Sequence, residues 1–228
     1  MSVIAPSTKE QIVLVAERLF AARGIEGVSL RQIGAAAGNG NNSAVQYHFG
    51  TKDRLVQAVF EYRLPRLRER GAVLIAERRP DDLRSWVEHG IRVLLEQSEL
   101  EGSNYMSFVA TLYQYGRRDV LEQLPGDFLA GTKTYHDCLV GFMTHVDEPL
   151  RTHRIAQALA LIVHAASDRE RARAASKLVL PFAVAVGDLL DGMVGFLEAP
   201  VSAASRDALE RAEPAHVTWS VFLQSGGV

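Results

Sequence analysis

The chain has 228 residues, of which 47% are hydrophobic and 23% are charged, and its formal net charge is −2. This balance is typical of a globular protein and excludes a wholly disordered chain, which would bury too little apolar surface to fold. The single cysteine, Cys138, excludes a disulfide framework, and apolar stretches shorter than about 18 residues predict no membrane-spanning helix, so we expect a cytoplasmic protein without a membrane partner.

Basic residues are relatively concentrated at the start of the chain. Residues 1–56 hold six lysines and arginines and four acidic residues, whereas the remainder holds 19 of the 25 basic and 23 of the 27 acidic residues. A mildly basic N-terminal region is compatible with nucleic-acid binding by that region alone. The alternative interpretation is a chance difference between two solvated surfaces.

Three short helices are predicted before residue 50. The first begins at Ser7 or Thr8, with Glu10 placed to assist the cap, and ends at Gly24, because glycine accepts the left-handed conformation that closes a helix. The second begins at Ser29 and ends at Gly38. A turn-rich run at residues 39–42 separates it from the third helix, at about 43–49. Apolar side chains recur at helical spacing in the first helix, at Ile12, Val15, Ala16, Leu19 and Phe20.

A long fourth helix is predicted from Thr51, and Pro65 within it is expected to kink or split it, because proline lacks the backbone N–H. We expect the domain junction near this point, with one domain at 1–56 and a second at 57–228. Asp81 or Asp82 would cap the next helix, which carries Leu83, Val87, Ile91, Leu94 and Leu95. Further helical patterns cover 103–117, 126–146, 150–168 and 178–198, with Pro149 and Pro181 near helix starts. No strand-like alternation is sustained, so the predicted class is all-α.

The run from Ser29 to Leu55 carries the strongest functional signal. Two short helices joined by a tight Gly/Asn turn have the sequence form of a helix-turn-helix, and the start of the fourth helix would favour a phosphate through its backbone N–H groups and Lys52. Polar side chains in this run are types that bind phosphates or base edges. The predicted DNA-binding residues are Ser29, Arg31, Gln32, Asn41, Asn42, Ser43, Ala44, Gln46, Tyr47, His48, Thr51 and Lys52.

These residues carry a family resemblance. The segment from Ile12 to about Val59 resembles the DNA-binding domain of the tetracycline-repressor (TetR) family. The similar features are Phe20-Ala-Ala-Arg-Gly24, Ser29-Leu-Arg-Gln-Ile33 followed by Ala35-Ala-Ala-Gly38, and the Tyr47-His48-Phe49 block followed by Lys52-Asp53 and Leu55. The alternative interpretation is that Tyr47, His48 and Phe49 are only core and boundary residues of a small helical bundle, and for Phe49 we adopt it.

The resemblance implies an N-terminal three-helix DNA-binding domain followed by a larger helical bundle for ligand binding and dimerisation. A homodimer would present its two third helices to successive major grooves of operator duplex DNA, and a small-molecule effector would change their spacing. Two C-terminal apolar stripes are expected at the dimer face, with internal core as the alternative. They hold Ile155, Leu159, Ile162, Val163 and Ala166, and Phe182, Val186, Leu189, Leu190, Met193 and Leu197.

Bulky side chains in the middle of the chain are candidates for an apolar effector pocket, with tyrosine hydroxyls or histidines to orient the ligand. The alternative is that they are ordinary core. The predicted ligand-binding residues are Trp86, His89, Tyr105, Met106, Phe108, Tyr113, Tyr135, Phe142 and His145.

Sequence patterns for catalysis are incomplete. The run from Gly126 to Thr134 resembles a phosphate-binding loop with one inserted residue and no preceding strand, and the histidines lack metal-ligand spacing. We therefore expect no catalytic residue, metal or cofactor. The resemblance implies a one-component transcriptional regulator that is not an enzyme, namely a repressor released by a small, largely apolar ligand. The rival interpretation is an all-α small-molecule-binding protein or enzyme whose N-terminal helices only mimic a helix-turn-helix.

Overall fold

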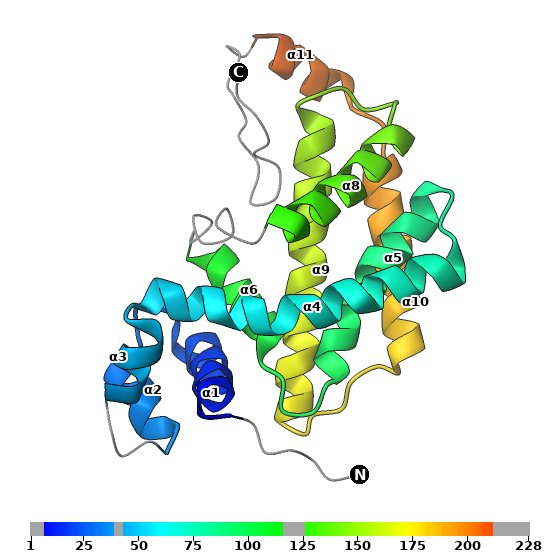
Figure 1. Cartoon of the computed structure of the whole chain (residues 1–228). Coiled ribbons are helices and arrows are strands. Elements are labelled where there is room, and N and C mark those ends of the chain that lie inside the picture. Colours follow the sequence, from blue (N-terminus) through cyan, green and yellow to red (C-terminus); the bar gives the residue numbers. More distant parts are fainter. Residues whose placement is uncertain (1–6, 39–42, 116–125, 212–228) are drawn as a thin grey trace.

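The computed structural model describes residues 7–38, 43–115 and 126–211, and every regular element within these ranges is a helix (Figure 1). The predicted all-α class is therefore confirmed. Helices α1 (Thr8–Arg23), α2 (Leu30–Ala36) and α3 (Ser43–Phe49) lie together at one end of the molecule, and we call them the head. The helices from α5 onwards form a larger unit, which we call the body.

Local hydrogen bonds fix the start of both α1 and α2. The Ser7 hydroxyl accepts from the Glu10 amide at 3.3 Å, while the Glu10 carboxylate accepts from the Ser7 amide at 2.7 Å. Ser29 and Gln32 form the same reciprocal capping box at the start of α2. Gly24 ends α1 with a φ of 72°, as predicted. The turn predicted at residues 39–42 lies outside the described residues.

Helix α4 (Lys52–Arg78) connects the head to the body and runs across the front of the molecule (Figure 1). The predicted split at Pro65 is wrong, because α4 is one helix with Pro65 inside it. Pro65 is exposed, and it removes only the hydrogen bond that its amide would donate to the Glu61 carbonyl. Burial of Leu64, Leu67 and Leu74 along the same helix offsets this loss. The domain boundary at residue 56 stays a prediction.

The body contains the remaining described helices. They are α5 (Leu83–Leu95), the short 3₁₀ helix η1 (Glu96–Glu99), α6 (Tyr105–Gln114), α8 (Gly126–Phe142), α9 (Leu150–Ala174), α10 (Phe182–Glu198) and α11 (Ala203–Arg211). Asp82 caps α5, and Pro149 and Pro181 immediately precede α9 and α10, as predicted. Two of these elements, η1 and α11, were not anticipated from the sequence.

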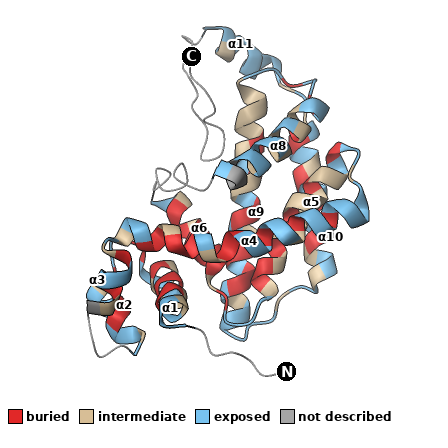
Figure 2. Ribbon diagram, in the orientation of Figure 1, coloured by how far each residue is buried: buried red, intermediate tan, exposed pale blue. Residues whose placement is uncertain are grey.

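One apolar core continues from the head into the body (Figure 2). Phe20 of α1 packs against Phe108 of α6 with ring centroids 6.3 Å apart, and Phe60 of α4 lies 5.4 Å from the same ring. All three rings are at most 2% exposed. The head is therefore docked on α4 and α6 by close-packed aromatic side chains, whose pairing adds to the free energy of burial.

The apolar stripes that were expected at a dimer face are mostly buried within this chain. Six of these side chains, including Met193, are at most 4% exposed, and the buried stripe of α10 packs alongside α5 and α9. A side chain with so little exposed surface has none to offer a second copy. The expected residues therefore need correction, because the internal core that was the alternative interpretation accounts for Ile162, Val163, Ala166, Val186, Met193 and Leu197.

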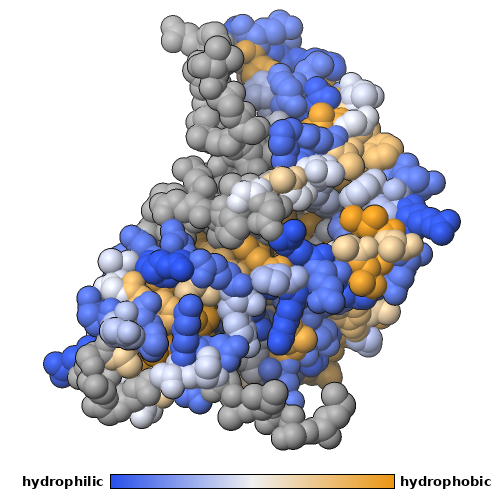
Figure 3. Space-filling view, in the orientation of Figure 1, coloured by the Kyte–Doolittle hydropathy of each residue, from blue (hydrophilic) through white to orange (hydrophobic). Residues whose placement is uncertain are grey.

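The face in Figure 3 is largely hydrophilic, with separate apolar patches between charged side chains. Scattered apolar groups of this kind are normal on a protein surface. In the ranges that the structure describes, none of the helices is both long and apolar enough to cross a membrane.

A buried ion pair joins the head to α4 at the start of α6. The Arg63 guanidinium donates two hydrogen bonds to the Glu17 carboxylate, at 2.6 and 2.7 Å, and the two residues are 7% and 1% exposed. The same carboxylate accepts from the backbone amide of Asn104 at 3.0 Å, just before α6 begins. Three helices thus meet at one carboxylate.

A second buried carboxylate, from the body, completes the cap of α6. Glu170 of α9 is 4% exposed and accepts from the amides of Met106 and Ser107, at 3.2 and 2.8 Å. Asn104 makes no cap hydrogen bond with its own side chain. The amides of Asn104, Met106 and Ser107 are therefore satisfied by Glu17 from α1 and Glu170 from α9, while the Tyr105 amide donates to the Ser103 hydroxyl. Negative charge at a helix N-terminus is stabilising.

Replacement of Glu17 by glutamine should cost about 3–5 kcal/mol of folding free energy, because it leaves the Arg63 charge buried without its partner. The matched control is Glu61→Gln, which removes the exposed carboxylate paired with Arg54 and should cost at most about 1 kcal/mol. Urea unfolding followed by circular dichroism measures both. Equal losses in the two variants would contradict the structural role of the buried pair.

Candidate functional site

Helix α3 presents three consecutive polar or aromatic side chains to solvent. Gln46, Tyr47 and His48 are exposed, and Tyr47 is 86% exposed with its ring edge-on to His48 at a centroid distance of 5.2 Å. Val45 and Phe49 on the same helix are buried at 0% and 6% and anchor it to the core. The sequence interpretation of Phe49 as a core residue is confirmed. A ring as exposed as that of Tyr47 buries little apolar surface and so contributes little to the stability of the fold.

Helix α2 contributes one exposed cation and two side chains that are already engaged. Arg31 is exposed in the first turn, whereas the Ser29 hydroxyl and the Gln32 amide oxygen bond to each other and to the backbone in the capping box. The roles predicted for Ser29 and Gln32 toward DNA therefore compete with their capping bonds. Their part in DNA binding stays a prediction.

The remaining predicted DNA-binding residues on either side of α3 are only partly described. Asn41 and Asn42 lie outside the described residues. Ser43 begins α3, but its side chain also lies outside the described part of the chain. Ala44 is half-buried and packs against the core.

The start of α4 is tied back to the loop between α1 and α2. The Thr51 hydroxyl accepts from the Arg54 amide at 3.1 Å, which caps the helix as predicted. The Lys52 ammonium donates to the Ile25 carbonyl at 3.2 Å and to the Glu26 carboxylate at 2.8 Å. Sequence reasoning placed Lys52 toward a phosphate and missed this contact, because its partners lie 26 and 27 residues earlier.

Three of the predicted ligand-binding residues meet between α4, α5 and α8. The rings of Trp86, His89 and Tyr135 form a triangle with centroid distances of 5.7, 6.2 and 6.1 Å. Gly90 allows this approach, because a Cβ there would lie 2.2 Å from the Tyr135 hydroxyl oxygen. The three rings therefore form a tightly packed aromatic junction, which we call the aromatic triangle.

The polar atoms of the aromatic triangle are poorly solvated. Burial lowers the pKa of His89 and raises the pKa of Tyr135, so both side chains are held neutral at pH 7. The Nδ1 atom of His89 is buried and, within the described part of the chain, has no hydrogen-bond partner. Such an atom is a candidate for contact with a polar group of a ligand.

The other predicted ligand-binding residues are spread over the body. Tyr105, Met106 and Phe108 are at most 3% exposed and belong to the core shared with the head. Tyr113 is half-buried near the end of α6, whereas Phe142 is 41% exposed and His145 is exposed just beyond α8. The sequence thus predicted one site where the structure separates the residues into the aromatic triangle, the core and the surface.

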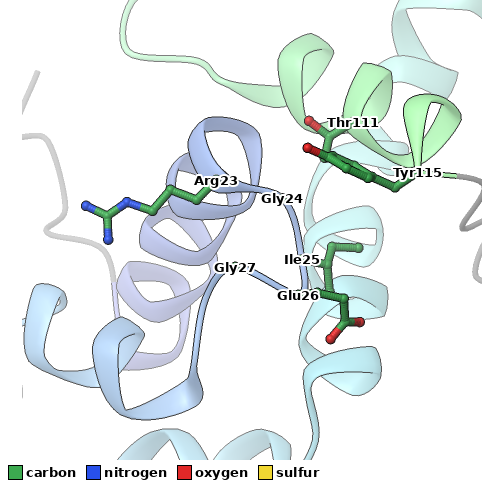
Figure 4. Close-up of a pocket in the computed structure, with 7 residues that line it drawn as sticks. All are labelled: Arg23, Gly24, Ile25, Glu26, Gly27, Thr111 and Tyr115. Carbon is green, nitrogen blue, oxygen red and sulfur yellow. The ribbon is translucent and has the colours of Figure 1, made fainter.

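A pocket that the sequence did not predict lies where the head meets the end of α6 (Figure 4). Its volume is about 370 Å³, and it is lined by Arg23, Gly24, Ile25, Glu26, Gly27, Thr111 and Tyr115. In the sequence, only Gly24 and Gly27 could have indicated a pocket at this loop. A Cβ at Gly27 would lie 2.2 Å from the Arg23 carbonyl oxygen, so this loop can close tightly only with glycine there.

No cluster of three or more metal-ligating side chains occurs within residues 7–38, 43–115 and 126–211. Cys138 is half-buried, and burial raises the pKa of its thiol, which disfavours the reactive thiolate. The structure thus offers two candidate functional sites: the exposed side chains of the head and the aromatic triangle of the body.

His89 should make folding stability depend on pH. Because its pKa is lower in the folded chain, the unfolded chain binds the proton more readily, and stability is lost as the pH falls below the unfolded value of about 6.5. Urea unfolding of the wild type and of His89→Gln at pH 7.5 and 5.5 should give a smaller decrease for the variant. Parallel decreases would show that His89 is not responsible.

Comparison with known proteins identifies the N-terminal segment. The sequence model of the family described as "Bacterial regulatory proteins, tetR family" matches residues 12–59, which span α1 to the start of α4. No curated protein matches the chain.

Two solved structures share the fold of most of the chain. A transcriptional regulator from Rhodococcus sp. Rha1 has a TM-score of 0.53 and 22% identity, over 84% of this chain and 96% of that one. NalD, the secondary repressor of the MexAB-OprM multidrug efflux pump in Pseudomonas aeruginosa, has a TM-score of 0.51 and 19% identity, over 82% and 94%. The family match identifies residues 12–59 as the DNA-binding domain of the tetR family of bacterial regulatory proteins, and the two solved structures share the helical fold of most of the chain.

Proposed function

We propose that this transcriptional regulator is a homodimeric repressor that reads operator DNA with α3 and is released by a small, largely apolar ligand. The observation that carries the proposal is the exposure of Gln46, Tyr47 and His48 on a helix anchored by two buried neighbours. A small-molecule carrier or enzyme, the rival function, would have no use for these side chains.

The side chains of α3 and α4 divide into two kinds of DNA contact. Gln46 carries an amide that can pair with adenine in the major groove. Tyr47 offers its hydroxyl to phosphate oxygens, and Lys52 adds its charge at the start of α4, where free backbone N–H groups also favour an anion. Lys52 can reach a phosphate by exchanging its bond to the exposed Glu26 carboxylate.

A dimer face is supported by the exposed apolar flank of the two long C-terminal helices, which lie side by side. On α10, Leu189, Gly192 and Phe196 recur at helical spacing beside the buried stripe; Leu189 is half-buried, whereas Phe196 is 36% exposed. On α9, Leu161 is 45% exposed. Apolar side chains exposed on adjacent helices favour self-complementary association about a two-fold axis.

The aromatic triangle is the proposed effector site. Trp86 and Tyr135 offer ring faces, and the Nδ1 atom of His89 offers a buried polar contact. Because the rings are packed against Gly90, a ligand would have to displace Tyr135, and α8 with it. Displacement of a body helix is how such a ligand would alter the spacing of the two heads and release a DNA whose half-sites lie about 34–36 Å apart.

Single substitutions should separate positioning from base reading. Lys52→Ala should weaken binding to all duplexes alike and reduce the slope of log affinity against log salt by about one. Tyr47→Phe should also weaken all duplexes alike. Gln46→Ala should cost about 1–3 kcal/mol on the operator and little on scrambled DNA.

The measurement is fluorescence anisotropy with the upstream DNA of the gene and with a scrambled duplex, each at two salt concentrations. Circular dichroism controls for folding. If Gln46→Ala weakens both duplexes equally while Lys52→Ala changes the preference, the assigned roles are reversed. If the wild type binds neither duplex at low salt, the proposed function itself fails.

Charge placed on the exposed flank should break the dimer. The double variant Leu161→Glu, Phe196→Glu should sediment as a monomer at concentrations where the wild type sediments as a dimer, because the carboxylates would be desolvated at the face. Val73→Glu on α4, at a side chain that is 40% exposed, is the matched control and should remain dimeric. A dimeric double variant would place the interface elsewhere.

A further inference from the structure

The pocket between the head and the end of α6 has a floor of backbone and a wall made by one aromatic ring. Gly24 and Gly27 contribute no side chains, and a Cβ at Gly24 would lie 3.2 Å from the Tyr115 ring. Tyr115 is 63% exposed, so a large part of its ring is available to a bound molecule. Figure 4 shows the Tyr115 ring and the Thr111 and Ile25 side chains around the opening, whereas the Arg23 side chain points away from it.

Two helices end at this pocket, and both ends carry partial negative charge. Helix α1 ends at Arg23 and α6 ends at Gln114, and the carbonyl groups in a last helical turn have no partner within the helix. The Glu26 carboxylate also lines the pocket, and its pair with Lys52 is the balancing positive charge. The Arg23 side chain is also among the lining residues, but it points away from the pocket, so the two helix ends and the Glu26 carboxylate favour a cation over an anion.

We propose that this pocket is a second small-molecule site, distinct from the aromatic triangle, and that it takes a flat organic cation. The Tyr115 ring face attracts a cation through its quadrupole, and the buried Ile25 closes the pocket beside it. A volume of about 370 Å³ accommodates one aromatic ring with an ammonium substituent.

Binding of a cation in this pocket should change the hydrogen bonds of the Lys52 ammonium. Residues 25 and 26 line the pocket and also hold the Lys52 ammonium through the Ile25 carbonyl and the Glu26 carboxylate. A cation beside Glu26 competes with Lys52 for the same carboxylate. The bound cation therefore releases Lys52 toward DNA phosphate and strengthens DNA binding, which is opposite in sign to the effector proposed for the aromatic triangle.

The first experiment measures binding with benzyltrimethylammonium as the probe, by methyl NMR of Ile25 and Thr111. The probe should shift both methyl signals, and benzenesulfonate, an anion with the same ring, should not. Tyr115→Leu and Glu26→Gln should each weaken the probe about three- to tenfold, whereas Tyr115→Phe, which keeps the ring, should retain it. Glu198→Gln is the control for loss of an exposed carboxylate and should leave binding unchanged.

Equal binding of the anion, or unchanged binding by Tyr115→Leu, would overturn the site. Shifts at the Ile91 methyl of α5 without shifts at Ile25 would also overturn it, because they would place the probe in the body. This binding experiment needs no DNA, so its outcome is independent of the proposed function.

The second experiment tests the coupling and rests on DNA binding by the head. Saturating probe should raise the affinity of the wild type for a duplex of arbitrary sequence, relative to sodium chloride at the same ionic strength, and should have no effect on Glu26→Gln. A decrease or no change in the wild type would overturn the coupling while leaving the site intact. Absence of any duplex binding without probe would instead count against the proposed function.

Discussion

The start of α6 is the point on which the arrangement of head and body depends. The exposed amides of a helix N-terminus must find acceptors, and here two buried carboxylates from different parts of the fold supply them. The Glu17 carboxylate of α1 accepts from the Asn104 amide, and the Glu170 carboxylate of α9 accepts from the Met106 and Ser107 amides. Arg63 of α4 balances the charge of Glu17. A shift of α6 against either partner would leave a buried polar group unsatisfied, so the three helices are fixed together.

The head is attached to α6 along the whole length of that helix. Glu17 bonds its start, the Phe20 ring packs against Phe108 in its middle, and Gly24 meets the Tyr115 ring just past its end. All three attachments come from α1 and its C-terminal cap. Helix α6 is therefore a main point of attachment between α1 of the head and the body.

Much of the candidate DNA interface was predictable, because its determinants are local. Exposed side chains at Gln46, Tyr47 and His48 follow from a short helix whose apolar residues lie on the opposite face. The Lys52 contact with the α1–α2 loop was not predictable, since its partners are distant in sequence. The effector residues were predicted by composition alone, which cannot distinguish an aromatic ring in a filled core, such as Phe108, from one beside a ligand.

The sequence by itself determined where the helices of the head begin and end. The capping boxes at Ser7 and Ser29 join residues three apart, and Gly24 needs only its own backbone freedom. Each feature can therefore be recognised from a few neighbouring residues in the sequence. Tertiary structure decided which polar groups are buried together, as in the bonds from Glu17 to residues 46 and 87 positions away. It also decided that α4 continues through Pro65. These outcomes depend on packing free energy summed over many distant contacts, which no local pattern encodes.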